Sequence, residues 1–414
     1  MKSQHPAKRK YPELNNLWIG LFVDIMGFYI IIPYLPELRL TFNTTPLVIS
    51  ALLATNAVFS LFSAPIWGRL SDKFGRKPML LIAESGTCTA FLILAFSNSL
   101  PMLFIARIVD GIFGGNFPIT KAIISDKVPP KDRGLQMTNF GVVFTFAGLV
   151  APALAGFLSL FKIFGPKYPL ALSGLVSAGF SFLTILITYF FIEESWPKSR
   201  REKTQKQFKF TIKFSKNKDA VYLLTQYALH SLSFMMYIST LTFFISIILG
   251  FDIVGISILL TISGISRAVV RFSLFKPTLR KLGEKRMTIL GLFILVIAFF
   301  LTGIFGLVYP ETWIFIVLMV FVSYGVSCSR GLLISKITQS VTPKEMGKIN
   351  GYTTTFDSLA QIIGPLLGVF LLGLNPLFYG IATGTLAFGA FIMIFKKIVP
   401  LMQKEQFQQV ERLE

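Results

Sequence analysis

Three charged residues interrupt apolar stretches of the sequence and could take part in proton transfer: Asp24, Arg107 and Asp110. A charge at the centre of a membrane helix costs about 2.5–3.5 kcal/mol on insertion scales, so a charged residue at such a position is a candidate functional residue. Asp24 has no charged neighbour on its own apolar stretch. A carboxyl whose surroundings change between two states can bind a proton in one state and release it in the other. We therefore expect Asp24 to carry a proton; the alternative is a structural hydrogen bond to another helix.

Arg107 and Asp110 are three residues apart, which places them on the same face of a helix. They can form a static, neutralised ion pair, or Asp110 can titrate while Arg107 positions and tunes it. The spacing leaves both readings open. Both residues are therefore candidates for proton coupling beside Asp24.

Further polar residues lie at a similar depth, as judged from the helical rise of about 1.5 Å per residue. Polar groups at one level predict a central cavity, and the candidates for its substrate-binding wall are Asn56, His230, Asp357 and Gln361. For His230, a hydrogen bond between helices is the alternative. Glu84 is near a predicted helix end, where we expect local pairing, and Arg330 is either a gate contact or an anchor at the membrane surface.

The composition of the chain indicates that membrane helices position these residues. Of the 414 residues, 53% are hydrophobic and only 14% are charged, whereas a soluble protein has about 25% charged residues. A membrane helix needs about 20 apolar residues. That length predicts twelve membrane helices, an all-α fold, near residues 16–36, 46–67, 78–97, 100–123, 135–160, 168–192, 220–249, 253–275, 286–308, 312–338, 347–373 and 376–397.

The basic residues of the chain gather in alternate connections between the predicted helices. The formal charge of +20 would suggest a nucleic-acid partner in a soluble protein. Here the alternation follows the positive-inside rule, which predicts cytoplasmic termini and no nucleic-acid partner. The connection 193–219 is the most basic, and we expect it to lie near anionic lipid headgroups.

Several classes of chemistry have little support. Cys88 and Cys328 both lie in apolar stretches, so neither a disulfide framework nor a cysteine metal site is expected. No nucleotide-binding signature, nucleophile constellation or metal cluster occurs, and we expect neither an enzyme nor a cofactor. The first apolar stretch lacks a small-residue cleavage site and is expected to be an uncleaved helix.

The sequence repeats itself. Residues 128–134 (VPPKDRG) align with 341–347 (VTPKEMG), and the same alignment places Pro152 on Pro365. Gly75 likewise matches Gly283 in a weaker repeat. We therefore predict an N-terminal six-helix half (1–192), a cytoplasmic linker (193–219) and a C-terminal six-helix half with a short tail (220–414).

A dense basic turn, residues 68–80 (GRLSDKFGRKPML), joins the second and third predicted helices. Gly68 and Gly75 would permit a tight reversal, Asp72 and Arg76 can pair, and Lys77 favours the cytoplasm. The stretch resembles the loop 2–3 signature of the major facilitator superfamily. That resemblance implies a closing latch formed by Asp72, Arg76 and Asp126, for which a surface ion pair of little energetic worth is the alternative.

Two other helices resemble the drug:proton antiporter subgroup, which includes the tetracycline exporters. They are the first helix around Asp24 and the fourth around Arg107, where Asp110 replaces the usual glutamine. The fifth helix carries an antiporter-like motif with Gly148, Pro152 and Gly156, in which Ala151 and Ala155 replace two glycines. Its second-half copy has Gly364 and Pro365.

The resemblance implies two halves that rock about a midplane substrate site. The predicted function is proton-coupled export of a small organic or amphipathic compound, by a monomer in the plasma membrane. The alternatives are a proton-linked or facilitative importer of a metabolite or sugar, and a receptor that kept the fold but does not transport.

Overall fold

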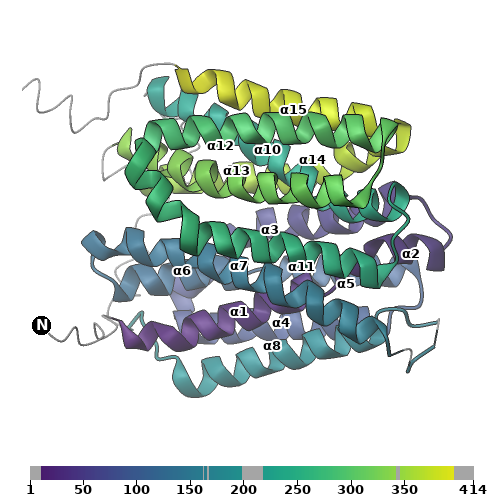
Figure 1. Ribbon diagram of the computed structural model, residues 1–414. Helices are drawn as coiled ribbons and strands as arrows, with labels where there is room; N and C mark the ends of the chain where they lie inside the picture. Colours follow the sequence, from purple (N-terminus) through teal and green to yellow (C-terminus); the bar gives the residue numbers. More distant parts are fainter. Residues whose placement is uncertain (1–10, 162, 166, 198–217, 342–345, 396–414) are drawn as a thin grey trace, which may run out of the picture. The chain divides into compact units, whose positions relative to one another are not determined.

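The computed structural model describes residues 11–161, 163–165, 167–197, 218–341 and 346–395, in which helices joined by short turns and loops occur and no strand does (Figure 1). Most of the predicted linker 193–219 and the tail beyond residue 395 lie outside the described residues. The same holds for the basic residues Lys8, Arg9 and Lys10.

The helices have the following bounds in chain order: η1 (Pro12–Leu14), α1 (Asn15–Tyr29), η2 (Ile32–Tyr34), α2 (Leu35–Thr41), α3 (Pro46–Phe74), α4 (Arg76–Ala95), α5 (Leu100–Ile112), α6 (Asn116–Lys127), α7 (Pro130–Ser159), α8 (Ala171–Phe191), α10 (Lys218–Ile247), α11 (Ile253–Val269), η3 (Val270–Leu274), α12 (Phe275–Val308), α13 (Thr312–Gln339), α14 (Met346–Leu374), α15 (Pro376–Ile392) and η4 (Met393–Phe395). The segment η3 is a π-helical turn.

Eleven helical runs in the described chain are long and apolar enough to cross a membrane. One of them, Ile253–Val308, has 56 residues. At about 1.5 Å per residue it would be about 84 Å long, more than twice the hydrocarbon thickness. Gly283 breaks it with non-helical angles, φ 71° and ψ 167°. The run therefore contains two predicted membrane helices, and the all-α membrane fold is confirmed.

Two glycines that align in the sequence repeat have the same unusual backbone. Gly75 ends the α3–α4 turn with φ 111° and ψ 153°, and Gly283, with φ 71° and ψ 167°, lies in the same broad region of positive φ and extended ψ. Residues with side chains rarely adopt this region. The prediction that Gly68 also takes part in the reversal is wrong, because Gly68 lies within α3, which continues to Phe74. The turn is tighter than expected, and α4 begins at Arg76.

The fourth predicted membrane helix is divided. Helix α5 ends at Ile112 and α6 begins at Asn116 after a short break at residues 113–115. Gly115 has no room for a Cβ, which would lie 2.7 Å from the Trp67 ring. The indole of Trp67 also donates a hydrogen bond to the Ile112 carbonyl (2.7 Å). The break places Asn116, a buried polar residue, at the first position of a helix.

The described chain packs as two compact units. Unit 1 comprises Met1–Ile31, Phe59–Ala151 and Phe161–Lys209, and unit 2 comprises Ile32–Val58, Pro152–Leu160 and Phe210–Glu414. The boundaries cross α3 and α7 rather than following the predicted halves. The division at residues 193–219 stays a prediction.

In unit 1, α8 packs against both α1 and α4 (Figure 1). Small residues allow these close approaches, as is usual where hydrophobicity cannot drive helix association. A Cβ on Gly174 would lie 2.7 Å from the Ala95 backbone. Ser177 of α8 donates a hydrogen bond to the Gly27 carbonyl of α1 (2.8 Å). Three helices are thereby fixed around the polar residues between them.

In unit 2, α10 packs on α14 and α12 packs on α15. A Cβ on Gly364 would lie 2.8 Å from the Met236 backbone nitrogen, and one on Gly303 would lie 2.7 Å from the Gly380 Cα. The tip of the first membrane helix also belongs here, since Tyr34 donates to the Ala155 carbonyl (3.1 Å). Gly156 has no room for a Cβ because Ser257 of α11 is 2.7 Å from that position.

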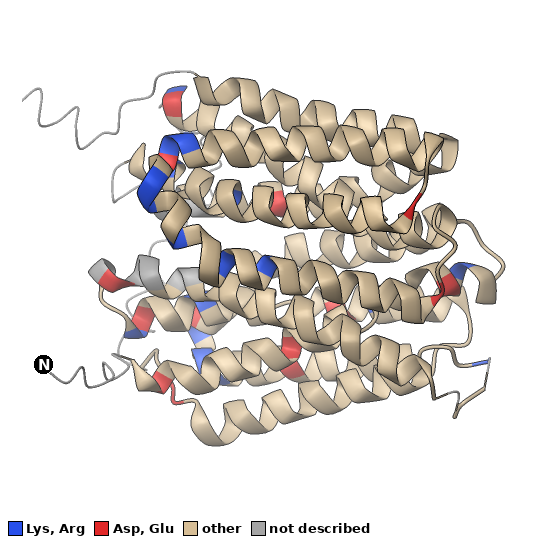
Figure 2. Ribbon diagram, viewed as in Figure 1, with Lys and Arg blue, Asp and Glu red and all other residues tan. Residues whose placement is uncertain are grey.

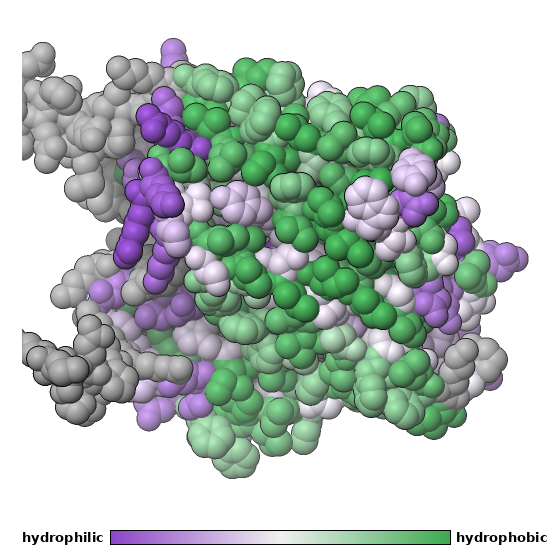
Figure 3. All heavy atoms as spheres, viewed as in Figure 1, coloured by the Kyte–Doolittle hydropathy of each residue, from purple (hydrophilic) through white to green (hydrophobic). Residues whose placement is uncertain are grey.

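Apolar side chains cover much of the drawn helix surfaces (Figure 3). Phe62, Phe190 and Val308 are each about two-thirds exposed or more, at 68%, 68% and 73%. Charges gather elsewhere: in unit 2, Lys and Arg cluster at one end of α12 (Figure 2), where Lys281, Lys285 and Arg286 are exposed. Apolar flanks and a basic end are what a lipid environment requires.

Candidate functional site

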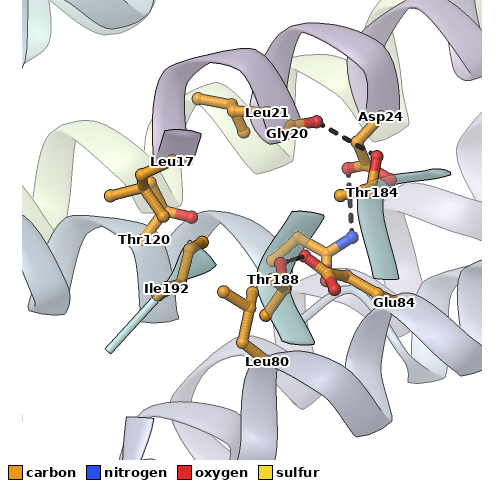
Figure 4. Close-up of a pocket in the computed structure, with 11 residues that line it drawn as sticks. Leu17, Gly20, Leu21, Asp24, Leu80, Glu84, Thr120, Thr184, Thr188 and Ile192 are labelled. Carbon is orange, nitrogen blue, oxygen red and sulfur yellow. Dashed lines mark hydrogen bonds between the residues drawn. The ribbon is translucent and has the colours of Figure 1, made fainter. Parts of the chain in front are cut away.

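Unit 1 contains a small cavity, lined by both apolar and polar side chains, with room for about one water molecule (Figure 4). Residues from α1, α4, α6 and α8 line it, together with Ile192 just after α8. They are Leu17, Gly20, Leu21, Asp24, Leu80, Glu84, Asn116, Thr120, Thr184, Thr188 and Ile192. Every polar group that lines it is a carboxyl, an amide or a hydroxyl. The cavity therefore offers oxygen atoms and one amide NH₂ group to whatever enters it.

In each of the two carboxyls that line the cavity, one oxygen accepts a hydrogen bond and the other does not. Asn116 donates from Nδ2 to Asp24 Oδ2 (3.0 Å), and Thr188 donates to Glu84 Oε1 (2.8 Å). The other oxygens, Asp24 Oδ1 and Glu84 Oε2, are buried and have no hydrogen-bond partner among the described residues. The same is true of Asn116 Oδ1. Buried acceptors without donors are costly, so these three oxygens favour a proton or another cation there.

The predicted Arg107–Asp110 pair is present on α5. Arg107 Nη1 lies 3.4 Å from Asp110 Oδ2, and the two residues are only 4% and 8% exposed. Asp110 is within electrostatic range of Asp24. The three candidates for proton coupling thus belong to one region of unit 1. Whether Asp110 is a static partner of Arg107 or titrates stays a prediction.

Glu84 is the residue that the sequence interpretation misplaced. It was expected to pair locally near a helix end, but it lines the cavity with Asp24 and is 4% exposed. Helix α4 begins at Arg76, so Glu84 is about 12 Å along it, a depth similar to that of Asp24 in α1. The predicted helix begins at residue 78, two residues after the observed start at Arg76, and therefore gave Glu84 too shallow a depth. Asn116 and Thr188 were also missed, although a polar residue beside Gly114 and Gly115 was a usable signal.

The predicted latch residues form a cluster at the α3–α4 turn. Arg76 pairs with Asp72 (Nη2–Oδ1, 2.7 Å) and with Asp126 of α6 (Nε–Oδ2, 3.0 Å). The Arg76 side chain is 7% exposed, and it also donates to Ser71 Oγ (2.7 Å). This is a buried, multiply bonded arginine and differs from a simple surface ion pair. Lys77 donates to the Tyr189 carbonyl (2.7 Å) and so ties the turn to the end of α8.

A segment that follows α8 closes over this cluster. The Arg76 guanidinium lies 5.0 Å from the Trp196 ring centre, and Ser195 donates to Asp126 Oδ2 (3.1 Å). Glu194 accepts from the backbone nitrogens of Arg76 and Trp196, both at 2.9 Å. We call residues 194–196 the clasp. The sequence shows an acidic, proline-ended stretch here but does not reveal this contact.

Unit 2 has its own polar cluster around Asp357 of α14. Arg330 of α13 pairs with it (Nη2–Oδ1, 2.9 Å), and Tyr227 and Ser231 of α10 both donate to it. Arg330, a candidate gate contact or membrane-surface anchor, is thus the ion-pair partner of Asp357, and its role in gating stays a prediction. Tyr227 and Ser231 were missed, although they are four residues apart and so share a helix face.

The remaining candidates, His230, Gln361 and Asn56, all lie in unit 2. His230 is fully buried, with Nε2 3.5 Å from Ser329 Oγ and Nδ1 without a hydrogen-bond partner in the described chain. Gln361 is exposed on α14, and Asn56 is half-buried in α3. Their place in a substrate cavity stays a prediction.

The antiporter-like motifs lie within long helices. Gly148, Pro152 and Gly156 are buried in α7, which continues through the proline. Pro365 is likewise buried within α14. Gly156 and Gly364 lie where two helices approach too closely for a side chain, as described for unit 2. The contacts account for these glycines by packing, and a role in antiport stays a prediction.

Comparison with known proteins agrees with this architecture. The family model described as Major Facilitator Superfamily matches residues 17–365 and 223–411. The chain is 28% identical over 356 residues to the tetracycline resistance protein, class H, of Pasteurella multocida, which covers 84% of this chain and 86% of that protein. It is 26% identical over 389 residues to the multidrug resistance protein MdtG of Proteus mirabilis, covering 89% and 91%.

Solved structures show the same fold at low identity. A D-xylose–proton symporter superposes with a TM-score of 0.77 at 16% identity, covering 93% of this chain and 97% of that chain. The human organic anion transporter MFSD10 (TETRAN) gives 0.72 at 18% identity, covering 94% and 100%.

Proposed function

Because the chain belongs to the major facilitator superfamily, and is therefore a multi-span membrane transporter of small molecules rather than an enzyme, we propose that it exports a small organic or amphipathic compound in exchange for protons. The relatives named for tetracycline and multidrug resistance support export. The observation that carries the proton coupling is the half-buried Asp24, whose Oδ1 atom is itself buried and has no donor among the described residues.

In this proposal Asp24 binds a proton at Oδ1 while the cavity is closed to bulk water. A neutral carboxyl avoids the cost of a desolvated charge. When the transporter changes state, water reaches the cavity and the ionised form becomes favourable, so the proton is released on the other side of the membrane. Asn116 holds Oδ2 in both states and fixes the orientation of the carboxyl. The Arg107–Asp110 pair tunes the local charge.

The substrate contacts are assigned to the Asp357 cluster, with Asn56, His230 and Gln361 as further candidates. The latch of Asp72, Arg76 and Asp126 is assigned to the cytoplasmic gate. We further propose that the protein works as a monomer in the plasma membrane, with both termini in the cytoplasm and the basic linker near anionic lipids.

The test uses purified protein in liposomes, with tetracycline and the amphipathic cation ethidium as probes. An antiporter accumulates a probe in liposomes loaded with acid, because protons that leave drive the probe inward. A symporter accumulates it when the outside is acidic. Both results are independent of how the protein is oriented. Accumulation only with acid outside would replace export by import, and binding without any flux would indicate a receptor.

A further inference from the structure

The proposed mechanism uses Asp24 and leaves Glu84 without a role. Glu84 is only 4% exposed, it lines the same cavity, and its Oε2 has no donor among the described residues. Figure 4 shows Glu84 and Thr188 at one side of the cavity and Asp24 at another. A buried carboxyl oxygen without a donor is costly unless a cation neutralises it.

The groups around Glu84 offer no such cation. Helix α1 contributes Asp24 to the lining, α6 contributes the neutral Asn116 and Thr120, and α8 contributes the neutral Thr184 and Thr188. No Lys, Arg or His is among the lining residues. Asp110 of α5, which also acts on Asp24, is paired with Arg107. Asp24 is the one other charged side chain among the residues that line the cavity, and its charge has the same sign as that of Glu84.

We propose that Glu84 is a second proton-binding carboxyl, which exchanges its proton through the cavity that it shares with Asp24. Uptake forms an O–H bond at Oε2 and leaves a neutral acid, and release returns the proton to water that enters the cavity. Thr188 keeps its hydrogen bond to Oε1 in both states. Two like-charged groups in one small cavity titrate as a coupled pair.

The inference has two parts, and only one rests on the proposed function. Proton binding at Glu84 is a property of the cavity. Its contribution to transport, one additional proton per substrate, requires the proton-coupled export proposed above. The two parts therefore need separate readouts.

Proton binding is measured by infrared difference spectroscopy of the full-length protein in liposomes during a pH titration, in sodium-free buffer. Protonated buried carboxyls give C=O bands that ionise with pH. We expect Glu84→Gln to remove one band and Asp24→Asn to remove another. Thr188→Val is the matched control: it keeps both carboxyls and should shift the frequency of the Glu84 band without removing it.

Two results would overturn the proposal. The first is a folded Glu84→Gln protein with the same carboxyl bands as the wild type. The second is a Glu84 band whose intensity stays constant across the whole pH titration, because the carboxyl would then hold a proton without exchanging it. If Glu84→Gln fails to fold, Glu84→Asp decides, since a shifted band supports proton binding and an unchanged spectrum contradicts it.

Transport is measured separately with the tetracycline assay. The number of protons exchanged per tetracycline should fall by one in Glu84→Gln. If wild-type protein shows no gradient-driven flux, the proposed function fails, and the infrared result for Glu84 still stands or falls independently.

Discussion

Arg76 of α4 donates from Nε to Asp126 Oδ2 of α6 across 3.0 Å, and both side chains are nearly buried, at 7% and 10% exposed. The contact joins two helices that are 50 residues apart in the chain. Asp72, the other partner of Arg76, is 35% exposed. The two carboxylates therefore differ in how much solvent weakens their attraction to the arginine.

That difference predicts unequal effects of neutralising the two aspartates. Asp126→Asn leaves a buried guanidinium with a weaker partner and should lower the free energy of unfolding by about 1.5–3 kcal/mol. Asp72→Asn should lower it by only about 0–1 kcal/mol, because the pair is solvated. Thermal unfolding of the two purified variants shows which of them is the less stable. Equal effects would mean that the burial of Asp126 is unimportant.

The gating role gives Asp126→Asn a second readout. If the latch closes the cytoplasmic side, a loss of about 1.4 kcal/mol shifts the population about tenfold toward the inward-open state. Spin labels on Lys73→Cys and Gln339→Cys, in a variant without Cys88 and Cys328, would report longer distances. Unchanged distances together with unchanged flux would leave the latch a purely structural cluster.

The clasp should stabilise the latch through its aromatic ring. Trp196→Ala removes a ring 5.0 Å from the Arg76 guanidinium and should cost about 0.5–2 kcal/mol of stability. Trp196→Phe is the matched control, because it keeps a π-face at the same position, and it should cost less. The melting temperatures of both variants test this. The contact is absent or unimportant if Phe and Ala behave alike.

Glycine is required at Gly75 and not at Gly68. Gly75→Ala forces a side chain into backbone angles that favour glycine and should cost about 1–3 kcal/mol. Gly68→Ala is the matched control, since Gly68 is helical with open space around its Cβ position, and it should be neutral or stabilising by up to about 1 kcal/mol. Unfolding midpoints of the two variants provide the comparison, and a reversed order would contradict the turn geometry.

The Arg330–Asp357 pair should act as one unit. In a double-mutant cycle with Arg330→Gln and Asp357→Asn, we expect a coupling energy of about 0.5–3 kcal/mol in stability. If the cluster contacts substrate, both single variants should also raise the tetracycline concentration needed for half-maximal flux. Ser358→Ala, one residue away, serves as the control, because the Ser358 hydroxyl donates to the Thr354 carbonyl of its own helix. A coupling near zero would show that the pair contributes little.

The sequence predicts the membrane helices well, because their length and apolar character are local properties. It also predicts the Gly75 and Gly283 turns, since a repeated glycine indicates a repeated backbone requirement. The sequence does not predict the partners of Glu84 and Asp357. Glu84 meets the Asp24 cavity only because α8 packs against both α1 and α4, and Arg330 meets Asp357 only because α13 and α14 are neighbours. Such contacts depend on helix packing rather than on spacing.

The central claim is that Asp24 couples proton movement to transport, and Asp24→Asn tests it most directly. The amide mimics a protonated carboxyl but cannot release a proton, and it removes a desolvated charge, so the variant should fold and express normally. Asn116→Ala is the matched control: it removes the hydrogen bond and keeps the carboxyl. The assay is tetracycline accumulation in acid-loaded liposomes, beside tetracycline exchange without a pH gradient. We predict that Asp24→Asn loses gradient-driven accumulation and retains exchange. Full gradient-driven accumulation in Asp24→Asn would contradict the account.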